Sequence, residues 1–198
     1  NVQQMEGVVQ LAIAAGAGSV KFNPVMRSGR GIAMHEHGES LEAEEIIRLA
    51  HWVRGELQER TPIRLILSTP VAFYTIKELL QVKGDGVCHV RHILGILGDG
   101  SMALCGIGRS VPELVYGRLG RDSLKRVWVE NPVLLELRAD LDNGHSGICI
   151  HCLHKEQCLS YCVAQNFNDS GKLVAPTQLC KEAALLGIFP LGRLWNVE

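Results

Sequence analysis

The chain has 198 residues, enough for one substantial hydrophobic core or two small ones. It is 46% hydrophobic and 21% charged, which is typical of a globular protein and excludes the disordered and collagen-like classes. The net charge of -1 gives no electrostatic reason to expect nucleic acid or a membrane surface as a partner. We find no apolar run long enough to span a membrane and no signal-peptide pattern, so we expect a cytoplasmic protein.

Helical and strand patterns alternate in the first 80 residues. Residues 5–18 carry apolar side chains at helical spacing and end in glycines, and residues 20–25 form a short apolar strand pattern. Ser40 can cap a second helix, and residues 63–68 are a nearly continuous apolar strand, as in strands that are covered on both faces. This alternation predicts an α/β fold with a parallel sheet.

Two short apolar segments, 93–97 and 102–104, flank a turn that contains Gly100. They predict a β-hairpin with Gly100 as a turn residue at positive φ. The hairpin would fold Cys105 back toward Cys88 and so bring two cysteines together that are far apart in the sequence.

A helical pattern follows after Ser123, which can serve as its N-cap. Asn131-Pro132 is expected to break or kink this helix, because proline lacks the N–H and clashes with the preceding turn. We expect Trp128 and Leu135 to face inward, with Trp128 as a core residue and not as a stacking platform for a ligand.

Cysteines carry the clearest chemical signal in the sequence. Four of them lie within fourteen residues at the spacing C-x2-C-x5-C-x3-C: Cys149, Cys152, Cys158 and Cys162. Cys88 and Cys105 precede this run and Cys180 follows it. Thiolates are soft ligands that suit zinc or an iron-sulfur cluster. The odd count and the tight spacing favour metal-binding thiolates over disulfides.

The full pattern is C-x11-G-x4-C, a gap, C-x2-C-x5-C-x3-C, a gap, and C. It resembles the seven-cysteine signature of the SPASM domain, a C-terminal extension of many radical S-adenosylmethionine (SAM) enzymes. The composition changes at residues 81–86, which we take as a domain boundary. By resemblance, residues 1–83 would be the C-terminal part of a partial (β/α)6 radical SAM barrel. Residues 84–198 would be a small α+β SPASM domain with a β-hairpin and cysteine-rich loops.

The resemblance also implies a division of ligands between two auxiliary 4Fe-4S clusters. Cys149, Cys152, Cys158 and Cys180 would hold the second cluster, and Cys88, Cys105 and Cys162 would hold the first. Three cysteines leave one iron of the first cluster without a thiolate, and the chain has no eighth cysteine. His89, His92 or a substrate group is the candidate for this position.

The segment FNPVMRSGRG at residues 22–31 resembles a strand and loop with a Gly-Arg pair late in the barrel of SPASM-containing enzymes. Loops at the C-terminal ends of barrel strands meet substrates and cofactors. Arg30 could therefore hydrogen-bond a carboxylate of the substrate or the ribose of SAM. An exposed arginine that only caps the barrel is the alternative.

By resemblance, the parent protein would be an oxidoreductase or maturase that modifies a peptide or protein, with flavodoxin or ferredoxin as electron donor. SAM cleavage needs a third 4Fe-4S cluster on a C-x3-C-x2-C loop, and no cysteine precedes Cys88. We therefore expect that loop upstream of Asn1, and this fragment alone to be inactive. The alternative is a zinc-stabilised cysteine-rich binding module without redox chemistry. A two-cluster ferredoxin fits less well, because its cysteine run has different spacing.

Overall fold

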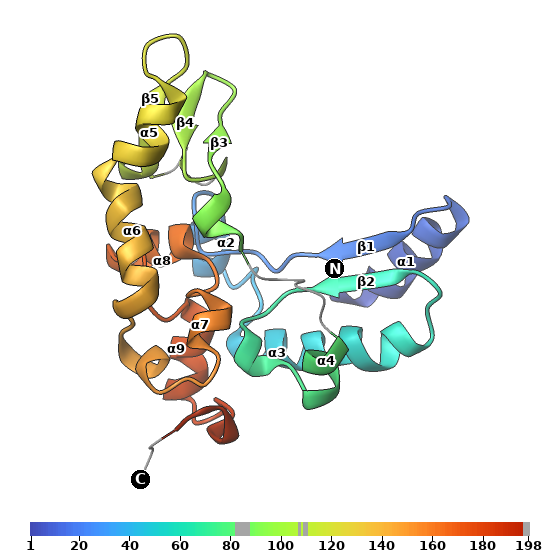
Figure 1. Cartoon of the computed structure of the whole chain (residues 1–198). Helices are drawn as coiled ribbons and strands as arrows, with labels where there is room; N and C mark the ends of the chain where they lie inside the picture. Colours follow the sequence, from blue (N-terminus) through green and yellow to red (C-terminus); the bar gives the residue numbers. More distant parts are fainter. Residues whose placement is uncertain (82–87, 107, 109–110, 196–198) are drawn as a thin grey trace.

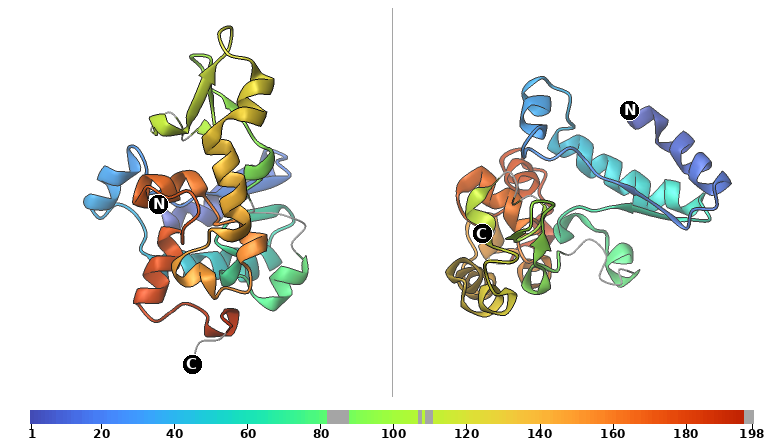
Figure 2. Two further views of the ribbon diagram at one scale, coloured as in Figure 1. Left: turned by 60° about the vertical axis from the view of Figure 1, so that its left-hand side comes forward. Right: turned by 90° about the horizontal axis from the view of Figure 1, so that it is seen from above.

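The computed structural model describes residues 1–81, 88–106, 108 and 111–195, arranged in two lobes that meet near the centre of the molecule (Figure 1). The first lobe holds the parallel sheet with its helices, and the second is a column of helices with a small antiparallel sheet at one end (Figure 2). None of the helices in the described part of the chain is both long and apolar enough to cross a membrane. The expected boundary at residues 81–86 falls almost wholly on residues outside the described set.

The first lobe is an α/β unit, as the sequence predicts. Its elements in chain order are α1 (Met5–Ala14), β1 (Ser19–Phe22), α2 (Gly31–Glu36), α3 (Ala43–Trp52), β2 (Arg64–Leu67) and α4 (Ile76–Gln81). Strands β1 and β2 pair in parallel, with Ser19 opposite Arg64. They form a two-stranded sheet, and the described strands do not close into a barrel.

Helix α3 continues into a π-helical turn, Val53–Leu57, and both pack on the sheet. The cap of α3 differs from the prediction. Glu42, and not Ser40, is its N-cap, and Glu42 and Glu45 form a reciprocal capping box. Ser40 instead shares a 2.8 Å hydrogen bond with Nδ1 of His35.

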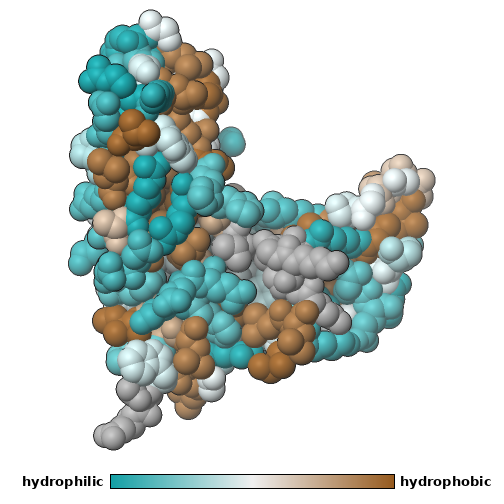
Figure 3. All heavy atoms as spheres, in the orientation of Figure 1, coloured by the Kyte–Doolittle hydropathy of each residue, from teal (hydrophilic) through white to brown (hydrophobic). Residues whose placement is uncertain are grey.

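The core of the first lobe consists of apolar side chains from α1, α3, the π-helical turn and β2: Met5, Val9, Ala50, Val53, Leu57, Leu65 and Leu67. The opposite side of α1 is uncovered, because Val8 is 46% and Leu11 is 71% exposed. Apolar surface is visible at the end of the molecule where α1 lies (Figure 3). One face of α1 thus packs in the core of the first lobe, and another apolar face is exposed.

The second lobe combines a small antiparallel sheet with, among the described residues, five α-helices and several 3-10 turns. In chain order its elements are β3 (Gly95–Ile96), β4 (Ser101–Ala103), β5 (Val115–Arg118), α5 (Leu124–Glu130), α6 (Pro132–Asn143), α7 (Lys155–Cys158), α8 (Val163–Ser170) and α9 (Gln178–Leu185). The predicted hairpin is confirmed by antiparallel β3 and β4, with Gly100 at φ +83°. The sequence analysis missed β5, which pairs with β4.

The predicted break in the long helical segment is confirmed. Ser123 caps α5 by accepting a hydrogen bond from the Arg126 N–H, and Asn131 caps α6. The prediction for Leu135 was wrong, because this residue is 47% exposed. The break rotates the apolar face, so that the inward residues are instead Val127, Leu134, Leu137 and Leu141. Trp128 is half-buried, and the guanidinium of Arg138 lies over its ring, with Cζ 4.4 Å from the ring centroid.

Several contacts tie the two lobes together. Phe73 and Phe189 pack edge to face, with ring centroids 5.5 Å apart. The Tyr161 hydroxyl donates to the carbonyl oxygen of Ser68 across 2.9 Å, at the end of β2. Arg193 donates to the carbonyl oxygen of Tyr74 across 2.8 Å. The cysteine-rich part of the second lobe is therefore anchored directly to the sheet end of the first.

Candidate functional site

Four cysteines meet at one small cavity in the second lobe. They come from four places along the chain: Cys149 from a 3-10 turn, Cys152 from the following loop, Cys158 from the end of α7, and Cys180 from α9. The cavity measures about 20 Å³, and Pro70 and Ala72 of the first lobe complete its wall. This group matches the ligand set expected for the second cluster, and we call it the inner group.

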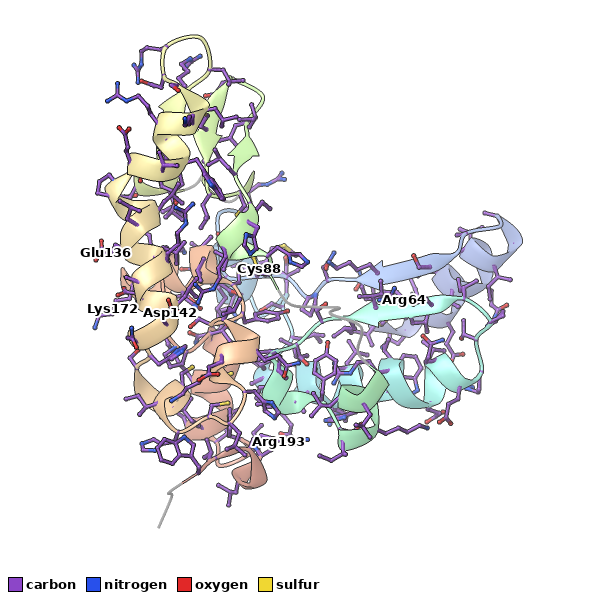
Figure 4. The ribbon with its side chains drawn as sticks, in the orientation of Figure 1. Arg64, Cys88, Glu136, Asp142, Lys172 and Arg193 are labelled. Carbon is purple, nitrogen blue, oxygen red and sulfur yellow. The ribbon has the colours of Figure 1, made fainter. Side chains whose placement is uncertain are left out.

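The remaining three cysteines lie close together at a second place in the second lobe. Cys88, Cys105 and Cys162 all pack against the hydrophobic cluster that α6 and α8 build in the second lobe. Cys88 lies where the two lobes meet (Figure 4), and the hairpin places Cys105 within electrostatic reach of Cys88. We call these three cysteines the outer group.

The thiol pKa values also separate the cysteines into these two groups. Burial, together with the charge of neighbouring inner-group thiolates, raises the pKa of Cys149 to about 12 and that of Cys158 to about 11. Burial likewise raises the pKa values of Cys88 and Cys162, and the nearby Cys105 charge adds to both. In each case the cysteines that raise a thiol's pKa belong to its own group. Deprotonating such thiols requires a positive charge among them, which a bound metal supplies.

A left-handed turn separates Cys158 from Cys162. The three residues between Cys158 and Cys162 have φ values of +50° at Leu159, +59° at Ser160 and +60° at Tyr161. Left-handed backbone costs about 1–2 kcal/mol for each residue that carries a Cβ. The turn joins α7 to α8, and the two cysteines on either side of it, four positions apart in the sequence, belong to different groups.

Asn166 holds this turn in place from α8. It is fully buried, and its side-chain amide donates to the carbonyl oxygens of Ser160 and Ala175 at 2.9 Å each. A third, longer hydrogen bond of 3.4 Å reaches the carbonyl oxygen of Leu173. Nothing in the sequence singles out Asn166, apart from its being a polar residue beside Val163 and Ala164 on a short helix.

A larger cavity of about 380 Å³ lies between the lobes, and Cys88 and Cys162 of the outer group line it. Arg27 also lines it and forms a 2.6 Å ion pair with Glu182 of α9. Arg30, the residue singled out in the sequence, is exposed and is not among the residues that line this cavity. Of the two arginines in this loop, Arg27 is therefore the one that lines the cavity, together with residues 23–26.

The histidines near the cysteines fall into two classes. His89, His92 and His151 are exposed, and His151 lies beside Trp195 with ring centroids 6.3 Å apart. His145, which the sequence analysis did not single out, lines the inner-group cavity. Its position four residues before Cys149 was the available signal.

Some buried polar atoms near the cysteines have no hydrogen-bond partner among the described residues. They include both ring nitrogens of His145, Nε2 of His154, the hydroxyl of Ser160 and the hydroxyl of Tyr116. The Cys105 charge, after burial, raises the pKa of Tyr116, so this hydroxyl lies near the outer group. Buried donors without partners are rare, and those that line the inner-group cavity, His145 and Ser160, suit sulfur-rich ligands, whose sulfur atoms accept hydrogen bonds.

All seven cysteines are free thiols. In the described part of the chain, however, no group of three or more His, Cys, Asp or Glu side chains is already arranged to hold a metal ion. The chemistry and the grouping of the thiols fit iron-sulfur clusters or zinc, and a bound metal would have to draw them into coordination. A scan against models of known protein families and a search of curated proteins each found no match.

Proposed function

We propose that this chain is part of a radical SAM enzyme with a SPASM domain and that it binds two auxiliary 4Fe-4S clusters. The inner group would hold one cluster through Cys149, Cys152, Cys158 and Cys180. The outer group would hold the other through Cys88, Cys105 and Cys162. The parent enzyme would modify a peptide or protein in the reducing cytoplasm, with SAM, a third cluster, and flavodoxin or ferredoxin as electron donor.

The separation of seven free cysteines into a group of four and a group of three carries this proposal. Two independent zinc sites would leave the outer group one ligand short of the usual four. A 4Fe-4S cluster with one open iron needs only three thiolates from the chain. His89 and His92 remain candidates for the fourth position because both follow Cys88 closely in the sequence, and a substrate group is the other.

Features of the first lobe support the proposal of a partial barrel. Parallel sheets occur almost only with helices on both faces and with more than two strands. Here two parallel strands stand alone among the described residues, and Val8 and Leu11 of α1 are exposed. Further strands and helices from the same protein would pair with the sheet and cover this apolar face.

The residues of the chain have separable roles in this scheme. A 4Fe-4S cluster, when bound, accepts or donates one electron at a time. Cys88 and Cys162 line the larger cavity, so the outer group would be the one close to a substrate. Arg27, fixed by Glu182, would hydrogen-bond an acidic or carbonyl group of that substrate, and Arg30 is the second candidate from the same loop. The inner group, enclosed on the far side of the turn, would pass electrons between the outer group and a partner protein.

Zinc at the inner group is the second candidate, and the small size of the cavity favours it. About 20 Å³ accommodates roughly one water-sized atom, so a four-iron cluster would have to push the thiols apart. Four cysteines also match a structural zinc site in number. The chain would then be a binding module without redox chemistry.

The test is to measure iron, acid-labile sulfide and zinc per chain, together with a visible absorption spectrum, on protein prepared without oxygen. We expect about eight irons and eight sulfides with broad absorption, as two 4Fe-4S clusters require. Stoichiometric zinc that persists after anaerobic reconstitution with iron and sulfide would overturn the proposal in favour of the binding module.

A pair of substitutions tests the division of ligands. Cys158→Ala should remove about four irons by abolishing the inner cluster, and it should expose residues 145–185 to limited proteolysis because cluster binding supplies folding energy. Cys162→Ala is the matched control only four positions away, and it should remove the outer cluster instead. The EPR signals of the two variants should be complementary; identical signals or undiminished iron would refute the division.

A further inference from the structure

The inner-group cavity contains two hydrogen-bond donors that the thiols do not account for. His145 has both ring nitrogens buried without a partner among the described residues, and the buried Ser160 hydroxyl is in the same condition. Both residues line the cavity together with the four inner-group cysteines. An unsatisfied buried polar group is costly and rare, so two of them at one small cavity indicate that an acceptor binds there.

The side chains that line the cavity offer few hydrogen-bond acceptors for these donors. The other residues that line it are apolar or carry a cation or a thiol: Pro70, Ala72, Ile148, Lys155, Phe189 and the four cysteines. Lys155 is a donor, and its ammonium group already bonds the carbonyl oxygen of Ile150 at 3.2 Å. Thiolate or inorganic sulfide is then the acceptor that both His145 and Ser160 would meet.

We propose, resting on the function proposed above, that His145 and Ser160 donate hydrogen bonds to sulfur atoms of the cluster in the inner group. Such bonds stabilise the reduced state, which carries one more negative charge, and so raise the reduction potential. The two residues act as positioning and tuning groups and not as ligands, because the four cysteines already complete the coordination.

The two donors are held in different ways. Ser160 is the middle residue of the left-handed turn, and Asn166 bonds its carbonyl group, so the backbone that carries the hydroxyl is held in place. His145 precedes the 3-10 turn Gly147–Ile150, which carries Cys149. His145 thus precedes the cysteine run, and Ser160 lies within it, between Cys158 and Cys162.

Three variants of the full chain, reconstituted anaerobically with iron and sulfide, test this inference by EPR-monitored redox titration. His145→Phe removes the donor, His145→Gln keeps an N–H donor, and His154→Phe is the matched control. His154 also has a buried nitrogen without a partner, but it is not among the residues that line the cavity. We expect His145→Phe to destabilise the reduced inner cluster about tenfold, a fall of about 59 mV for a one-electron couple.

The same fall should be absent in His154→Phe and largely reversed in His145→Gln, and Ser160→Ala should shift the potential in the same direction. Pulsed EPR of the reduced cluster with ¹⁵N-labelled histidine should show a coupling that His145→Phe abolishes. Equal potentials in His145→Phe and His154→Phe would overturn the inference. If His145→Phe takes up no iron, the reduction potential of Ser160→Ala is compared with that of His154→Phe instead, and equal potentials would again overturn the inference. An unsubstituted chain that takes up no iron would refute the proposed function itself, which is a different result.

Discussion

The side-chain amide of Asn166 donates a 2.9 Å hydrogen bond to the backbone carbonyl of Ser160, the middle residue of the left-handed turn. Asn166→Ala leaves this carbonyl and that of Ala175 unpaired in the interior, which should destabilise the chain by about 2–4 kcal/mol. Urea unfolding measures the loss, and iron content should fall as the turn loosens. The matched control is Asn168→Ala, an exposed residue whose amide makes a long 3.4 Å hydrogen bond to the carbonyl oxygen of Arg27 and also bonds Asp169; it should change stability by less than about 0.5 kcal/mol.

Among the charged residues of the first lobe, Arg54 should be the one whose substitution lowers the free energy of unfolding most. Its guanidinium pairs with Glu78 at 2.7 Å and donates to the carbonyl oxygens of Leu67 and Phe73, with its side chain only 9% exposed. Arg54→Met removes the ion pair of the half-buried Glu78 carboxylate, leaves two backbone carbonyl groups unpaired and should cost about 3–5 kcal/mol in unfolding experiments. Arg60→Met breaks two exposed ion pairs, with Glu6 and Glu56, and should cost less than about 1 kcal/mol. Similar losses in the two variants would contradict the role assigned to Arg54.

Glu78 should give the first lobe a stability that depends on pH in the acid range. Burial opposes its charge, but hydrogen bonds from Thr75 and Arg54 prevail and hold the pKa of Glu78 below its ordinary value of 4.5. The folded pKa is the lower one, so this stabilisation is present above about pH 4.5 and is lost as the pH falls through the folded pKa. Urea unfolding between pH 3 and pH 6 should show the slope, and Glu78→Gln should reduce it. An unchanged slope in that variant would assign the acid sensitivity to other carboxyl groups.

Replacing Gly100 should destabilise the hairpin because of its backbone conformation and not because a side chain would clash. An added Cβ meets no atom within 4 Å, but the residue sits at φ +83°. Gly100→Ala should therefore cost about 1–2 kcal/mol. Gly98→Ala is a close control, because Gly98 has equal free space and no positive φ. Iron bound by the outer group should fall in Gly100→Ala alone, because the hairpin positions Cys105.

Several elements could be predicted because their signals are local. The parallel pair β1 and β2, the hairpin with Gly100, the Ser123 cap and the break at Asn131 all follow from propensities within a few residues. The caps show the limit of this reasoning. Serine is preferred over glutamate at N-cap positions, yet α3 begins after Glu42, because Glu42 and Glu45 form reciprocal capping hydrogen bonds.

The remaining features depend on contacts between distant segments. Leu135 lies on the predicted face only if the helix is continuous, and the break at Asn131 turns that face outward. The left-handed turn at 159–161 contains no glycine, so no local rule predicts it. Arg27 and Arg30 lie in the same loop, and only packing against α9 decides which one meets the cavity.

The shared turn has a thermodynamic consequence for how the chain is loaded. On the function proposed above, an occupant at either group stabilises the turn conformation that the other group needs, because Cys158 and Cys162 flank the same three left-handed residues. The two binding equilibria are then linked, and the coupling is the same in both directions. With limiting metal, we expect a mixture of empty and doubly loaded molecules in which singly loaded ones are scarce, and the turn itself would be the allosteric element.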